Sequence, residues 1–181
     1  WRDTANDANA RTCVVSALGD VAVARNNSPG VFPSVPGAQV PALLANLSSF
    51  AVDFACRKKL GGTHLTRSAL HQLPVFPPAF FEESRPWLDI PRVMEWIRPR
   101  VLELTYTAWD LEPFARDVGW DGPPFRWDPD RRFLLRCELD AAFFHLYGVS
   151  RDDAGYILDS FPVVRKNEEK AHGEYRTRRV V

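Results

Sequence analysis

The chain has 181 residues, of which 45% are hydrophobic and 25% charged, a composition typical of folded proteins that argues against global disorder. Its 23 basic and 23 acidic side chains balance, and no apolar run approaches the roughly 20 residues of a membrane span. No basic-then-apolar signal segment opens the sequence, and Cys13, Cys56 and Cys137 lie too far apart for a disulfide scaffold or zinc site. We therefore expect a cytoplasmic protein that has no membrane or metal partner. Because the first residue is Trp1, we also expect a piece of a longer polypeptide.

Charge is distributed unevenly along the chain. Residues 1–67 hold seven basic and four acidic side chains, for a net charge of +3. Residues 68–130 carry a net charge of −5, and residues 131–181 carry +2. A neutral average therefore allows a basic face at each end of the chain, and it does not exclude nucleic-acid binding.

In the first half, the β-branched and apolar runs Thr12–Leu18 and Val21–Arg25 predict two short strands of a hairpin. Residues 26–39 are rich in Ser, Pro and Gly and predict a loop. The segment Pro41–Leu60 predicts a single helix, with Pro at its start, cations in its last turn and Gly61 after its end. Its expected buried stripe contains Leu43, Leu47, Phe50 and Phe54.

The second half has the signals of several helices. We expect helices over 91–98 and 99–108 separated by Pro99, a short helix after Asp110 that stops at Gly119, a long helix from Asp128 to Tyr147, and a helix capped by Ser150. The tail from Arg165 is charged. These elements predict an α+β fold, in which a small antiparallel sheet packed with a helix (residues 1–85) precedes a mainly helical subdomain (residues 86–181).

The motifs of common enzymes are missing. No glycine-rich loop precedes a helix, and no Gly-x-Ser-x-Gly elbow occurs. Residues 121–125 (DGPPF) are similar to the Asp/Asn-Pro-Pro-aromatic motif of amino-group methylases, but Gly122 interrupts the motif. His145 lies seven residues from Glu138 and five from Asp140, whereas metal-binding pairs on a helix prefer spacings of three or four. We therefore predict no catalytic and no metal-binding residues.

The most informative segment is residues 57–67, where three cations end a helix and two glycines follow. Glycines allow close approach of a backbone, and the neighbouring side chains are of the kinds that contact phosphates and base edges. The alternative is a helix end at which cations complement the helix dipole, followed by a flexible turn. The candidate DNA-binding residues are Arg57, Lys58, Lys59, Gly61, Gly62, Thr63, His64 and Arg67.

Three segments carry a resemblance to a known family. They are the run Leu43–Pro78 (LLANLSSFAVDFACRKKLGGTHLTRSALHQLPVFPP), the N-terminal run Trp1–Leu18 (WRDTANDANARTCVVSAL) and the C-terminal run Leu102–Val181. The first resembles the target-recognition region of large bacterial DNA adenine-N6 methylases of type II restriction–modification and of BREX- and DISARM-like phage-defence systems. The N-terminal run departs from the family pattern at Ala10, where Glu is usual. The predicted helix Pro41–Leu60 contains Asn46-Leu47-Ser48-Ser49-Phe50, whereas the family typically has an Asn-Ser-Phe-like sequence there.

This resemblance implies that residues 1–85 are a partial target-recognition domain and that residues 86–181 are the helical C-terminal end. The parent would be a site-specific DNA methyltransferase that uses S-adenosylmethionine, and the cofactor would belong to a missing upstream methylase domain, with none in this chain. The expected partners are double-stranded DNA, that upstream domain and other defence-system subunits. The alternative function is a protein-interaction module that docks another subunit through the acidic middle and the six tryptophans.

Overall fold

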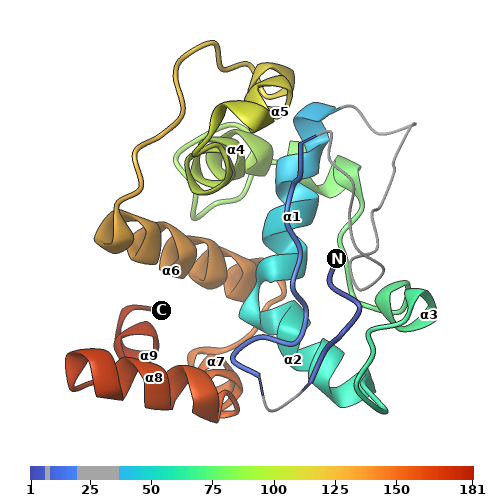
Figure 1. The fold of residues 1–181 in the computed structure, drawn as a ribbon, viewed down its shortest axis with the longest axis vertical. Coiled ribbons are helices and arrows are strands. Elements are labelled where there is room, and N and C mark those ends of the chain that lie inside the picture. The colour runs from blue at the N-terminus through green and yellow to red at the C-terminus, as the bar shows by residue number, and fades with distance from the viewer. Residues whose placement is uncertain (7–8, 20–36) are drawn as a thin grey trace.

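The computed structural model describes residues 1–6, 9–19 and 37–181, and these residues form a mostly helical fold (Figure 1). In chain order, with η for short 3-10 helices, the elements are η1 (Gly37–Gln39), α1 (Val40–Ser48), α2 (Phe50–Lys59), α3 (Arg67–Leu70), η2 (Pro78–Glu82), α4 (Val93–Thr105), η3 (Trp109–Leu111), α5 (Glu112–Asp117), α6 (Pro129–Leu146), α7 (Arg151–Asp159), α8 (Pro162–His172) and α9 (Arg176–Val180). None of the helices described here has the length and apolar character needed to cross a membrane.

The N-terminal segment (residues 1–6 and 9–19) runs beside α1 and α2 without forming a sheet (Figure 1). An isolated antiparallel β-bridge pairs Thr4 of this segment with His64. The prediction of an α+β fold with a small antiparallel sheet is therefore wrong. The second predicted strand, Val21–Arg25, lies outside the described residues.

The predicted strand Thr12–Leu18 fails because its first backbone groups bond to a side chain. The N–H groups of Thr12 and Cys13 donate to the buried carboxylate of Asp53 on α2, at 3.0 and 2.7 Å. A strand needs these groups for a ladder with a neighbouring strand. The β-branched residues that predicted a strand therefore lie in a segment outside any sheet, and the buried carboxylate of Asp53 holds the start of this segment in place.

The predicted helix Pro41–Leu60 is two helices, because Ser49 has extended backbone angles (φ −69°, ψ 150°). The Ser49 hydroxyl donates to the carbonyl of Asn46 at 2.8 Å and accepts from the N–H of Val52 at 3.3 Å. Serine is a favourable N-cap since its hydroxyl satisfies an otherwise free N–H. One side chain therefore ends α1 and begins α2.

Helix α1 lies at the centre of the molecule, packed against α4 (Figure 1). Their shared hydrophobic cluster also includes residues of η2 and α6, and it consists of Ala42, Ala45, Phe81, Val93, Met94, Ile97, Val101, Leu139 and Phe143. Pro99 lies inside α4, so the predicted break there is wrong. Buried residues on both sides of Pro99 favour a continuous helix despite the lost N–H. The predicted boundary between residues 85 and 86 stays a prediction.

The predicted starts of α6 and α7 are confirmed. The Asp128 carboxylate accepts from the N–H groups of Asp130 and Arg131, both at 3.0 Å. The Ser150 hydroxyl accepts from the N–H of Asp153 at 3.1 Å. These caps satisfy N–H groups that have no partner within the helix.

The charged tail is helical and folds back toward α7. Gly173 adopts a left-handed conformation (φ 77°) between α8 and α9. Glu168 of α8 then accepts from the N–H and the hydroxyl of Thr177 at 2.8 and 2.6 Å. Sequence patterns indicate the charge of this tail, but they do not predict the turn at Gly173.

Candidate nucleic-acid interface

The predicted cationic turn is largely exposed. Helix α2 ends at Lys59, and the N–H of Leu60 closes it by donating to the carbonyl of Cys56 at 2.9 Å. The exposed members of the predicted site are Lys58, Lys59, Gly61, Gly62, Thr63, His64 and Arg67. Their side chains and backbone are therefore accessible to a partner in the described structure.

The N-terminal segment holds this turn in place. The N–H of Ala5 donates to the carbonyl of Thr63 at 2.9 Å, and the N–H of Leu65 donates to the carbonyl of Asp3 at 2.7 Å. The Asp3 carboxylate also lies 3.3 Å from Nδ1 of His64. These bonds hold the turn against the N-terminal segment, and the exposed side chains of Lys58, Lys59 and Arg67 lie on its surface.

Gly61 and Gly62 have no packing reason to be glycine in the described part of the chain. A Cβ atom built at either position would meet no other heavy atom within 4 Å. Glycine at such open positions removes steric bulk from the outer surface of the turn. This is the arrangement that a close approach by an external molecule requires.

Arg57 differs from the other candidates, because its side chain binds within the protein. Its Nη2 donates to the carbonyls of Asn9 and Ala10 at 2.7 and 3.2 Å. Its guanidinium also lies over the ring of Phe161, 4.0 Å from the centroid. Arg57 therefore ties the N-terminal segment to α2 and to the residue that precedes α8.

Asn46 connects α1 to the segment that follows α3. This fully buried side chain accepts from the N–H of Phe76 at 3.0 Å and donates to the hydroxyl of Tyr147 at 2.6 Å. The Tyr147 hydroxyl in turn donates to the carbonyl of Pro74. Asn46 and Pro74, both within the run Leu43–Pro78 that carries the family resemblance, thus meet in one buried network.

A second buried network surrounds Arg11. Its Nε lies 2.9 Å from a carboxylate oxygen of Asp53, and its guanidinium lies 4.0 Å from the centroid of the Phe50 ring. The N–H of Phe50 donates to the buried carboxylate of Asp140 at 2.8 Å. Burial raises the pKa of Asp140 to about 6, while the charge of Arg11 and the Phe50 hydrogen bond lower it. This network joins the N-terminal segment, α2 and α6.

The segment that is similar to a methylase motif has a structural role. The Trp120 ring stacks on Phe125 with centroids 4.9 Å apart, and its Nε1 donates to the carbonyl of Pro123 at 3.2 Å. A Cβ atom at Gly122 would lie 2.6 Å from the Trp120 ring. Gly122 is thus needed for this chain to wrap around the indole.

The cysteine, histidine and carboxylate side chains of the described ranges form no cluster of three or more that could hold a metal ion. The three cysteines are free and buried. Burial raises the pKa of Cys137 to about 12, so its thiol stays protonated near neutral pH.

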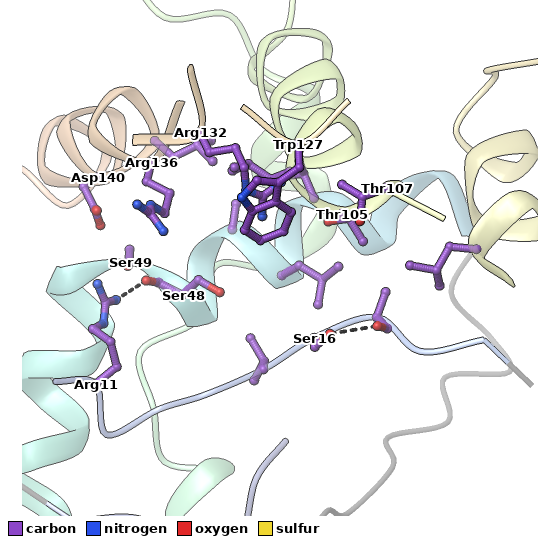
Figure 2. A pocket seen from close by; sticks show the side chains of 18 residues that line it. Arg11, Ser16, Ser48, Ser49, Thr105, Thr107, Trp127, Arg132, Arg136 and Asp140 are labelled. Atoms are coloured by element: carbon purple, nitrogen blue, oxygen red, sulfur yellow. Dashed lines mark hydrogen bonds between the residues drawn. The ribbon is translucent and has the colours of Figure 1, made fainter. Parts of the chain in front are cut away.

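The structure also contains a cavity that no sequence pattern predicted. It has a volume of about 440 Å³ and lies between the N-terminal segment, α1, α4 and α6. Arg11, Arg132, Arg136 and Trp127 line it (Figure 2). The available signal was the pair of arginines four residues apart on the predicted long helix.

No protein family model, no curated protein and no solved structure matches the chain in the three comparisons made.

Proposed function

We propose that this chain is the non-catalytic DNA-recognition part of an S-adenosylmethionine-dependent DNA adenine-N6 methyltransferase from a restriction–modification or phage-defence system. The observation that carries the proposal is the exposed cationic turn held on the N-terminal segment. Cations on such a turn neutralise DNA phosphates, and side chains beside them reach the groove. The partners are double-stranded DNA and the upstream methylase domain of the same cytoplasmic polypeptide, where S-adenosylmethionine binds.

Each group of the turn has a specific role in this proposal. Lys58 and Lys59 contact phosphates, while Thr63, His64 and Arg67 approach the groove across the open glycines. Arg57 holds the turn against the N-terminal segment, because its guanidinium bonds to the carbonyls of that segment. DNA fixed in this way would be positioned for the upstream domain to flip an adenine.

The experiment is a titration of labelled duplex DNA, followed by fluorescence anisotropy at several salt concentrations. The test variant is Lys58→Gln/Lys59→Gln, and the control is Lys166→Gln/Lys170→Gln, which removes two exposed lysines of α8. Each phosphate contact contributes about 0.9 to the slope of log K against log salt. The test variant should therefore lose about 1.8 of this slope, whereas the control should keep it. Equal slopes in both variants, or no binding by the wild type at low salt, would contradict the proposal.

A protein-interaction module is the second candidate. The observation that favours it is the exposure of Trp109 and Trp127, each 62% accessible. Aromatic side chains are enriched at protein interfaces. Binding of a purified defence-complex subunit that is lost with Trp109→Ala, but kept with Lys58→Gln/Lys59→Gln, would favour this candidate over DNA recognition.

A further inference from the structure

The arginine-lined cavity has a charge imbalance. Arg132 and Arg136 lie one turn apart on α6, and Arg11 enters from the opposite side on the N-terminal segment (Figure 2). Asp140 supplies the one carboxylate of the described lining, and it is buried against the Phe50 N–H. Arg11 is paired with Asp53, which lies outside the lining. The positive charge of the cavity therefore exceeds its negative charge.

Arg132 and Arg136 differ from neighbouring arginines because neither forms an ion pair within 4.0 Å among the described residues, although the charges of Glu103 and Asp140 act on them from a longer distance. On the same helix, Arg131 lies 3.0 Å from a carboxylate oxygen of Glu103. Arg132 instead has a buried Nη1 without a hydrogen-bond partner in the described part of the chain. Burial, and then the charge of Arg136, lower the pKa of Arg132, while the charge of Glu103 raises it by less. Two adjacent guanidinium groups that repel each other at a cavity form a site for an anion.

The other walls of the cavity suit a flat, partly apolar group. Leu44, Val101 and Leu104 supply apolar surface, and Trp127 projects its indole over the opening (Figure 2). The Arg132 guanidinium covers one face of this indole at 3.7 Å from the ring centroid. Since Trp127 is still 62% exposed, much of its ring is available for stacking. Aromatic side chains of this kind are common stacking surfaces for nucleic-acid bases.

From these features we infer that the cavity binds a nucleotide, with its phosphate on Arg132 and Arg136 and its base against Trp127. The volume of about 440 Å³ lies within the range of small-molecule sites. The shared chemistry is a phosphate attached to a nucleoside, which a free mononucleotide or a single DNA strand can supply. This inference is independent of the proposed function, because it uses none of the residues of the cationic turn.

The experiment measures binding to the full chain by isothermal titration calorimetry. The ligands are deoxyadenosine monophosphate, deoxythymidine monophosphate, inorganic phosphate and a short oligothymidine. Arg136→Gln replaces an exposed arginine that forms no ion pair within 4.0 Å in the described part of the chain, and it should weaken nucleotide binding at least tenfold. Trp127→Ala should weaken the binding of nucleotides but leave inorganic phosphate unchanged. Arg151→Gln, an exposed arginine of α7 outside the cavity, is the matched control and should keep wild-type affinity.

The outcomes separate the alternatives. Tighter binding of oligothymidine than of mononucleotides identifies a single strand as the ligand, and the reverse identifies a free nucleotide. The inference is overturned if inorganic phosphate binds as tightly as the nucleotides, if no nucleotide binds at millimolar concentration, or if Arg136→Gln has no effect. Lys58→Gln/Lys59→Gln should keep nucleotide binding, so a failure of the DNA-recognition proposal is recognised separately.

Discussion

The buried carboxylate of Asp140 gives the fold a testable dependence on pH. Its side chain lies on α6, where it accepts from the N–H of Phe50 at the start of α2. Replacing it in Asp140→Asn keeps an oxygen that can accept this hydrogen bond and removes the ionisable group. The variant therefore isolates the effect of the charge from the effect of the shape.

The magnitude follows from the two pKa values. Burial raises the pKa of Asp140 from 3.8 to about 6 in the folded state. The unfolded chain therefore releases this proton at a lower pH than the folded protein does, and stability falls as the pH rises from about 4 to about 6. A difference of this size is worth about 3 kcal/mol, since a tenfold change in proton affinity equals about 1.4 kcal/mol.

Urea unfolding, followed by circular dichroism at several pH values, tests this reasoning. The free energy of unfolding of Asp140→Asn minus that of the wild type should increase by about 2 kcal/mol between pH 4 and pH 7, because at pH 4 the unfolded chain has already released part of this proton. Asp121→Asn, at an exposed position, is the control for the loss of a surface carboxylate. A difference that stays constant with pH, or that decreases, would refute the argument from burial. The Arg11 charge and the α2 N–H would then outweigh desolvation.

The two buried networks predict further effects on stability. Asp53→Asn should lower the free energy of unfolding by about 2–4 kcal/mol, because the half-buried Arg11 loses its ion-pair partner and the N–H groups of Thr12 and Cys13 lose a charged acceptor; chemical denaturation measures this, and a loss below 1 kcal/mol would contradict it. Asn46→Ala should cost about 2–5 kcal/mol, because the N–H of Phe76 and the hydroxyl of Tyr147 both lose a partner. Its decrease in melting temperature, compared with the surface variant Asn167→Ala, checks this value, and equal melting temperatures would disprove it.

Local signals at helix ends predicted much of the second half of the fold. Asp128 and Ser150 cap α6 and α7 as expected, because a short polar side chain satisfies N–H groups within its own turn. Gly119 and Gly148 have φ values of 86° and 67° and follow the ends of α5 and α6. Such signals act over a few residues, so they can be recognised without knowledge of the tertiary structure.

The failures have a different origin, since they depend on partners distant in sequence. Residues 12–18 resemble a strand, but Asp53, some 40 residues away, takes their first N–H groups. Pro99 would end an isolated helix, yet packing between α1 and α4 keeps α4 continuous. The cavity was missed for the same reason, because Arg11 and Arg136 meet only in the folded chain.

The structure divides the residues that carry the family resemblance into two groups. Asn46 and Arg57 bond within the protein, so their chemistry is explained by the fold without any ligand. Lys58, Lys59 and Arg67 are exposed, and the fold accounts for them only in part: both lysines lie in the last turn of α2, where cations complement the helix dipole, and Lys58 Nζ lies 5.2 Å from the centroid of the Phe54 ring. If the resemblance reflects shared DNA recognition, substitutions in the first group should act through stability, and those in the second group through affinity for DNA. Measuring both quantities for Arg57→Gln and for Lys58→Gln/Lys59→Gln distinguishes the framework of the site from its contact surface.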